Sequence, residues 1–180
     1  MTNIKLTSRD LDIIQFLKEF KIADTKTLQR LYFPSQSSCE KRLTKLADSR
    51  KIFRTRESTI SIYNYYVSKP TNIKHSLLIS DIYSRIATTE KLLKFKREYE
   101  LKFKKDILRC DFMAVIQRGG KVVPVIIEID LTKAYNNKYT QYIKSGHYKM
   151  LFPIEPVIVV ISNRTPKSDI PVTWVKLSEL

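Results

Sequence analysis

The first third of the chain has the apolar spacing of short amphipathic helices. Apolar side chains recur three residues apart up to Phe20, and this spacing predicts a helix with one buried face. Thr7 and Asp10 predict its N-terminal cap. A second helix of about two turns is predicted after Asp24. It ends before Pro34, because proline disfavours a helical conformation in the residue that precedes it.

A third helix and a hairpin are predicted next. Residues 35–50 place Cys39, Leu43 and Leu46 on one helix face and short polar or cationic side chains on the other. Residues 51–67 then predict two alternating strands about a polar turn. The apolar side chains of this hairpin are expected to pack on the helices, and they are Ile52, Ile60, Ile62, Tyr63 and Tyr65.

Three helices followed by a basic hairpin are typical of a winged helix-turn-helix domain. In that arrangement the third helix enters the major groove of DNA, and the hairpin, or wing, holds the flanking backbone. The alternative is a solvated helix face, but the position of the cations just before a basic hairpin favours DNA contact. The predicted DNA contacts are Gln36, Ser37, Ser38, Lys41, Arg42, Lys45, Arg54 and Arg56.

The second half has the patterns of an α/β domain. Residues 72–88 predict a helix, and residues 91–105 predict a strand because apolar and charged positions alternate. The cations of that strand either bind phosphate or protect a sheet edge from aggregation. Further elements are predicted as strands over 108–116, 121–131, 157–162 and 172–177, with a helix over 134–148.

These elements predict an α+β or α/β protein of two domains. Residues 1–70 form the winged helix-turn-helix domain, and residues 71–180 form a small αβββαβ domain. The crossover helix before the strand over 157–162 requires at least one parallel strand pair, so we expect a mixed sheet.

The charge balance narrows the choice of partner. The chain has 33 Lys and Arg against 18 Asp and Glu, a net charge of +15, which attracts polyanions such as nucleic acid. It has no apolar run long enough to span a membrane and no signal-peptide pattern at the N-terminus, so we expect a cytoplasmic protein without a membrane partner. Cys39 and Cys110 fit no zinc-ligand spacing.

Three acidic residues form a candidate metal site. Glu128 and Asp130 are two apart in a predicted strand and therefore point to the same face, which Asp111 on a neighbouring strand can join. Three carboxylates repel one another unless a cation or a proton relieves them. They are a candidate Mg²⁺ site, and no other cofactor is expected.

The order of these elements and acids resembles the PD-(D/E)xK nuclease fold. That motif asks for Glu-x-Lys, where the chain reads Glu128-Ile129-Asp130. The expected lysine is absent from the strand, and its candidate replacements are Lys133, Lys138 and Lys144. The proline that precedes the first acid of the motif is also absent. These departures favour a nuclease-like domain that does not catalyse cleavage.

Together the two halves resemble the replication-relaxation family, which joins a winged helix to a nuclease-like domain in proteins of plasmids and other mobile elements. The residues that carry this resemblance are His75, Asp111, Glu128, Asp130, Lys138 and Tyr142. It implies a role in plasmid replication, transfer or their regulation.

Three functions are compatible with the sequence. The favoured one is a sequence-specific double-stranded DNA-binding protein of a mobile element, acting as a homodimer in conjugative transfer, replication or transcription. The enzyme alternative is a metal-dependent DNA endonuclease or nickase that uses Asp111, Glu128 and Asp130, with Lys138 as a further candidate catalytic residue. A protein-interaction adaptor is the third class, and it predicts no salt-dependent DNA affinity.

Overall fold

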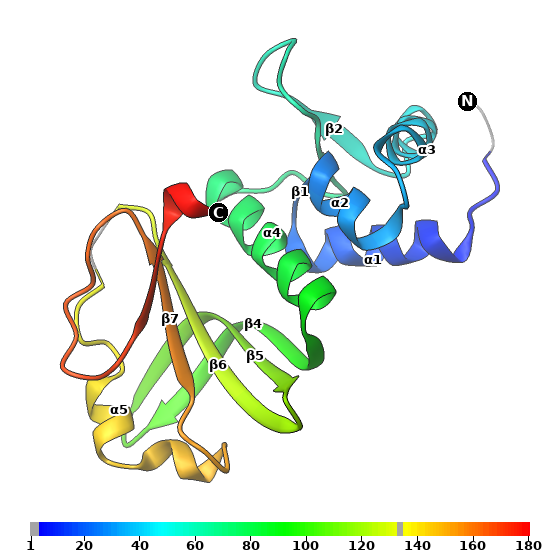
Figure 1. The fold of residues 1–180 in the computed structure, drawn as a ribbon. Helices are drawn as coiled ribbons and strands as arrows, with labels where there is room; N and C mark the ends of the chain where they lie inside the picture. The colour runs from blue at the N-terminus through cyan, green and yellow to red at the C-terminus, as the bar shows by residue number, and fades with distance from the viewer. Residues whose placement is uncertain (1–3, 133–134) are drawn as a thin grey trace. The chain divides into compact units, whose positions relative to one another are not determined.

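The computed structural model describes residues 4–132 and 135–180. The chain is a mixed α and β protein that divides into two compact units between Thr89 and Glu90. The boundary therefore lies after the helix over 73–89, and not near Pro70, because that helix packs within the N-terminal unit. Each unit has its own sheet (Figure 1).

The first unit combines four helices with a small antiparallel sheet of order β1-β3-β2. Its elements are α1 (Ser8–Phe20), β1 (Ala23–Asp24), α2 (Thr25–Tyr32), α3 (Gln36–Asp48), β2 (Phe53–Thr55), β3 (Asn64–Tyr66) and α4 (Ile73–Thr89). The three predicted helices and the hairpin are present. Thr7 and Asp10 form a reciprocal capping box at the start of α1, as the sequence predicts.

Apolar side chains from all these helices form the core of the first unit. Leu17, Leu28 and Leu43 are buried in it. The α4 helix adds Tyr83, whose ring centroid lies 4.6 Å from that of Phe20. Because α4 packs on α1, α2 and β1, it completes this core.

The second unit is built on a five-stranded mixed sheet of order β4-β5-β6-β7-β8. The first three strands are antiparallel, and β6, β7 and β8 are parallel. Its elements are β4 (Lys91–Phe103), β5 (Asp106–Arg118), β6 (Lys121–Asp130), α5 (Thr140–Lys144), the 3-10 helix η1 (His147–Met150), β7 (Val157–Ser162), β8 (Thr173–Lys176) and η2 (Leu177–Glu179). Gly119 and Gly120 have positive φ values of 56° and 77° and allow the tight turn between β5 and β6.

The helix predicted over 134–148 is much shorter in the structure. The α5 helix covers only Thr140–Lys144, and residue 134 lies outside the described residues. The chain before α5 pairs instead with the loop after β7, where the Lys167 amide donates to the Tyr135 carbonyl at 3.0 Å. Gly146, with a φ of 69°, ends the helical segment. This pairing is the physical reason that the prediction was wrong.

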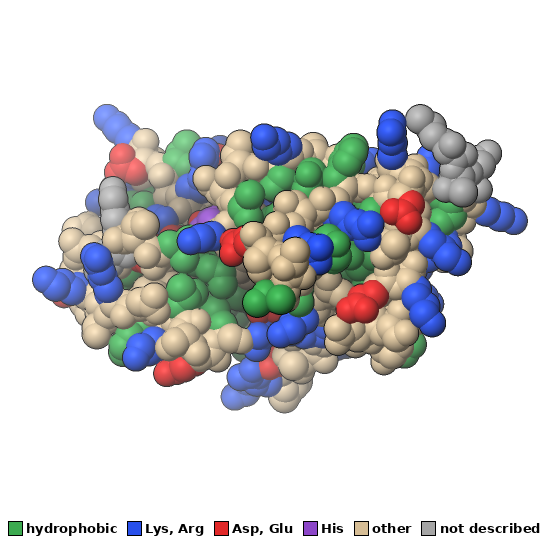
Figure 2. All heavy atoms as spheres, turned by 90° about the horizontal axis from the view of Figure 1, so that it is seen from above, with side chains coloured by type: hydrophobic (Ala, Val, Ile, Leu, Met, Phe, Trp, Pro, Cys, Tyr) green, Lys and Arg blue, Asp and Glu red, His purple; other side chains and the backbone are tan. Residues whose placement is uncertain are grey.

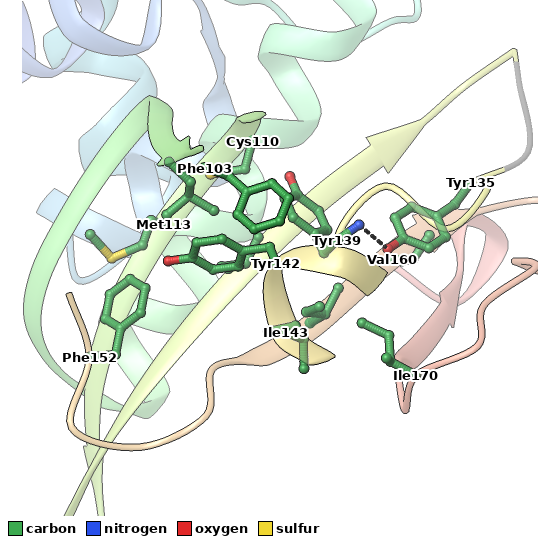
Figure 3. Packing of buried hydrophobic residues seen from close by; sticks show 13 residues of the cluster. Phe103, Cys110, Met113, Tyr135, Tyr139, Tyr142, Ile143, Phe152, Val160 and Ile170 are labelled. Atoms are coloured by element: carbon green, nitrogen blue, oxygen red, sulfur yellow. Dashed lines mark hydrogen bonds between the residues drawn. The ribbon is translucent and has the colours of Figure 1, made fainter. Parts of the chain in front are cut away.

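A cluster of aromatic and aliphatic side chains fills the core of the second unit. Tyr135, Tyr139 and Tyr142 lie around α5 together with Phe103 and Phe152 (Figure 3). The Tyr135 hydroxyl accepts a hydrogen bond from the Tyr139 amide at 3.3 Å. These contacts fix the segment before α5 next to β6, which matters for the carboxylate site described below.

Within residues 4–132 and 135–180, no helix combines the length and the apolar character that crossing a membrane requires.

Candidate nucleic-acid interface and carboxylate site

The α3 helix presents a polar face at its N-terminal half. Ser35 caps the helix, with its hydroxyl accepting from the Ser38 amide at 3.4 Å. Gln36, Ser37 and Lys41 are exposed, and Ser38 is half-buried. Gln36 Nε2 donates to Glu40 Oε1 at 2.7 Å, so this amide is held by a partner one turn later.

Arg42 is engaged inside the first unit. Its Nε atom donates to Asp10 Oδ1 at 2.8 Å, and its Nη2 atom contacts Asp10 Oδ2 and donates to the Lys5 carbonyl at 3.1 Å. The Asp10 side chain is fully buried, and the hydrogen bond from Arg42 lowers its pKa from 3.8 to about 2. Among the predicted DNA contacts, Arg42 thus differs from exposed Lys41 and Lys45 in having a buried counter-ion.

The two predicted hairpin cations both lie close to one aromatic ring. The guanidinium carbons of Arg54 and Arg56 each lie 4.9 Å from the centroid of the Tyr63 ring. Arg54 also donates to Thr44 Oγ1 at 3.3 Å and lies 3.5 Å from Asp48 Oδ1, which ties the hairpin to α3. Both arginines are exposed.

The apolar side chains of the hairpin divide into two groups. Ile52 and Tyr65 are buried, as expected. The expectation that Ile60 and Ile62 pack on the helices was wrong, because these side chains are 95% and 42% exposed. They lie in the loop between β2 and β3, beyond the short strands. A groove of about 310 Å³ between α3 and this loop is lined by both isoleucines, Tyr63 and Thr44.

Cationic side chains are widespread on the surface. Figure 2 shows Lys and Arg side chains scattered over the visible face, with fewer Asp and Glu side chains between them. The excess is carried by both units, since the second half of the sequence is also rich in lysine. Such a surface attracts a polyanion over a wide area.

Asp111 lies within β5, one residue before the ladder with β6, and Glu128 and Asp130 lie at the end of β6. Asp111 Oδ2 accepts the Ile129 amide at 2.6 Å, where the ladder between the strands has ended at the Phe112 and Ile127 pair. The carboxylate thus satisfies a backbone donor that the neighbouring strand does not reach. Asp130 is half-buried, and burial followed by the charge of Asp111 raises its pKa.

Glu128 is buried and has two donors from the segment before α5. Lys138 Nζ donates to Glu128 Oε1 at 2.7 Å, and the Tyr139 hydroxyl donates to the same oxygen. Lys138 also donates to the Arg109 carbonyl. Burial raises the pKa of Glu128, and the hydrogen bonds from Lys138 and Tyr139 oppose that shift.

Carboxylate oxygens are suitable donors for Mg²⁺, but this arrangement is not a formed metal centre. Over the described parts of the chain, no three His, Cys, Asp or Glu side chains are placed to bind one ion. The Lys138 ammonium contacts Glu128 directly, and Asp111 contacts a backbone amide. A divalent cation could bind Glu128 through Oε1 only after Lys138 moved.

Two of the three candidate lysines, Lys138 and Lys144, are among the described residues, and of these two only Lys138 lies beside the acids. It comes from the loop before α5, not from a helix. Lys144 lies at the exposed end of α5, and Lys133 lies outside the described residues. His75 is in the first turn of α4 in the other unit, and Tyr142 is a buried core residue.

Comparisons with protein-family models, with curated proteins and with solved structures found no match to this chain. A functional assignment therefore depends on the geometry of the two sites.

Sequence reasoning missed the residues that act as partners at these sites. Tyr63 contacts both hairpin arginines, Asp10 neutralises Arg42, and Tyr139 donates to Glu128. For Tyr139 the sequence did offer a signal, because this residue directly follows the candidate Lys138. Asp10 and Arg42 are 32 residues apart, and no periodic pattern connects them.

Proposed function

We propose that the chain is a sequence-specific double-stranded DNA-binding protein, with α1–α3 and the β2–β3 hairpin acting as a winged helix-turn-helix. The observation that carries this proposal is the pair of Arg54 and Arg56 on the Tyr63 ring, beside the exposed polar face of α3. An α-helix fits the major groove, and a hairpin next to it can reach the adjoining backbone.

In this proposal, α3 reads base edges. Gln36 is suited to adenine, because its amide can donate and accept together, and Lys41 is suited to guanine. Gln36 exchanges its bond to Glu40 for the base. Ser37 and Ser38 supply hydroxyl groups near the helix N-terminus, while Arg42 stays on Asp10 and holds α3 to α1.

Lys45, Arg54 and Arg56 contact phosphates. Stacking on Tyr63 holds both guanidinium groups in place before binding, so less side-chain freedom is lost when the backbone is contacted. A homodimer would read a palindromic site, with the second unit positioning or joining the two readers. The assignment to a plasmid or other mobile element, in transfer, replication or transcription, rests on the family resemblance of the sequence.

The test is selection of duplexes from a random 30-base-pair pool, followed by fluorescence anisotropy with the selected duplex and with a scrambled one. Wild-type protein should prefer the selected duplex, and Gln36→Ala and Lys41→Ala should each weaken that preference by about 1–3 kcal/mol. Lys18→Ala, which removes an exposed cation of α1, is the matched control. Equal affinity for selected and scrambled duplexes would refute sequence-specific reading.

The second candidate function is a metal-dependent DNA endonuclease or nickase. It is favoured by the presence of Lys138 beside Glu128, since this lysine comes from outside the strand yet lies next to the acids. Asp111, Glu128 and Asp130 would hold the Mg²⁺ ion, which when bound supplies an activated water and steadies charge on the phosphate. Lys138 would have to leave Glu128 and could then orient the substrate phosphate.

Incubation with supercoiled plasmid and Mg²⁺ or Mn²⁺ separates the two functions. The favoured proposal expects a gel shift without nicking. Nicking by wild-type protein that disappears in Glu128→Ala but persists in Lys144→Ala would establish the endonuclease instead.

A further inference from the structure

Ile60 is conspicuous among the large apolar side chains of the described residues because it is 95% exposed. Single exposed apolar side chains are common on protein surfaces. This one, however, lies in the loop of the hairpin that carries Arg54 and Arg56, and Ile62 in the same loop is also exposed.

The loop holds Ile60 at the tip of a closed turn. The Ser61 amide donates to the Ser58 carbonyl at 3.2 Å, and the two serine hydroxyls are 2.7 Å apart. Arg56 Nη1 donates to the Thr59 carbonyl at 2.8 Å. Ile60 occupies the third position of this four-residue turn, and with a negative φ that position accepts most residue types. The turn thus presents a stiff, branched apolar side chain to solvent.

The charge around this tip favours a polyanion as its partner. From Arg50 to Val67 the chain has four cations and one acid, Glu57. Each arm of the loop over 56–63 has four residues and can extend up to about 13 Å. This reach lets the tip pass a phosphate backbone. The minor groove next to that backbone is about 6 Å wide, less than the reach of the loop.

Resting on the proposed function, we propose that Ile60 is a wedge that enters the minor groove next to the α3 site and opens one base step. Proteins that insert an apolar side chain between base pairs unstack them partly and bend the duplex. Arg56 holds the turn through Thr59, and the cations of the hairpin draw the two backbones toward it. Pyrimidine–purine steps unstack most easily, so the wedge favours a duplex with such a step at that distance from the α3 site.

The experiment uses full-length protein and the 30-base-pair duplex selected by wild type, with 2-aminopurine placed in turn at each step. We expect wild type to raise the fluorescence at one step, because unstacking relieves quenching. Ile60→Ser should abolish that rise and weaken binding about three- to tenfold, since an apolar side chain is no longer buried. Ile60→Leu should retain the rise, and the salt slope should be the same in all three proteins.

Ile107→Ser is the matched control, because Ile107 is an exposed isoleucine of the second unit, near the start of β5. Thermal unfolding of Ile60→Ser should match that of wild type, since the side chain has little packing to lose. Salt-dependent binding without a fluorescence rise, or a rise that survives in Ile60→Ser, would overturn the wedge and leave DNA binding intact. A wild-type protein that binds no duplex overturns the proposed function, and the wedge with it.

Discussion

The charged groups of the β2–β3 hairpin and those around Glu128 on β6 are arranged in opposite ways. Arg54 and Arg56 are exposed and lie against a neutral ring. Glu128 is buried and faces an ammonium and a hydroxyl of its own unit. Apart from an exposed contact of Arg54 with Asp48, the hairpin charges are open to a polyanion, whereas the buried carboxylate is paired with Lys138. The first arrangement fits the DNA contact that we propose, and the second is an internal pairing.

Arg42 tests this contrast within α3, because its charge is internally paired like that of Lys138. Arg42→Ala should lower the free energy of unfolding by about 2–3 kcal/mol, because it leaves the buried Asp10 carboxylate without its strongest partner. Urea unfolding checks this value. Lys41→Ala, on the exposed face, should change stability by less than about 0.5 kcal/mol. Equal effects of the two substitutions would remove the distinction between paired and exposed cations.

The pH dependence of stability should have opposite signs for the two buried acids. The folded-state pKa of Asp10 is lowered from 3.8 to about 2, so its contribution is present above pH 3.8 and is lost as the pH falls toward 2. That contribution is about 2 kcal/mol. The folded-state pKa of Glu128 is raised from 4.5, so stability falls as the pH rises from 4.5 through the folded-state value.

Unfolding of Arg42→Ala and Glu128→Gln across pH 2–7 separates these two contributions. The first variant should lose most of the acid-side dependence, and the second should lose the decrease that begins above pH 4.5. A wild-type profile retained by both variants would contradict the pKa shifts.

Lys138→Met sharpens the comparison at the carboxylate site. Removing the ammonium should destabilise the second unit by about 1–2 kcal/mol, a reduced value because the lysine side chain is 35% exposed. The pKa of Glu128 should rise further, since the hydrogen bond from Lys138 is the first of the effects that lower it. Thermal unfolding and carboxylate titration by NMR check both results, with Lys144→Met as the control. A loss of DNA-binding free energy larger than the loss of unfolding free energy would show that Lys138 contacts the DNA.

Tyr63→Leu is the mildest way to disturb the hairpin. It keeps both arginine charges and removes the ring on which they stack. We expect a loss of DNA affinity of about 0.5–1 kcal/mol with an unchanged salt slope, because the number of phosphate contacts stays the same. Anisotropy titrations over a salt series measure both quantities. A lower slope would mean that the ring is needed for the contacts themselves.

Local patterns predicted the parts of the fold that local contacts stabilise. The capping box at Thr7 and Asp10, the stripes of α1 and α3, and the Gly119-Gly120 turn each depend on residues close in sequence. The shortened α5 could not be predicted, because its limit is set by pairing with the loop near Lys167. The same reason applies to Arg42, whose partner lies in another helix.

The candidate sites divide in the same way, into features set by residues close in sequence and features set by distant contacts. Spacing placed Asp111 and Glu128 on strands that are neighbours in the sheet, where Asp111 accepts the Ile129 amide, since strand periodicity is local. It could not indicate that Lys138 would already occupy Glu128, nor that Ile60 would be left in solvent. Both outcomes depend on how loops fold back, which an alternating pattern does not encode.

The most direct test of the central proposal is the salt dependence of DNA affinity for wild type and for Arg54→Ala/Arg56→Ala. The logarithm of the association constant is plotted against the logarithm of the salt concentration for the selected 30-base-pair duplex. If each arginine neutralises one phosphate, the slope of the double variant should be smaller in magnitude by about two. An unchanged slope would contradict the role of the hairpin in holding the DNA backbone.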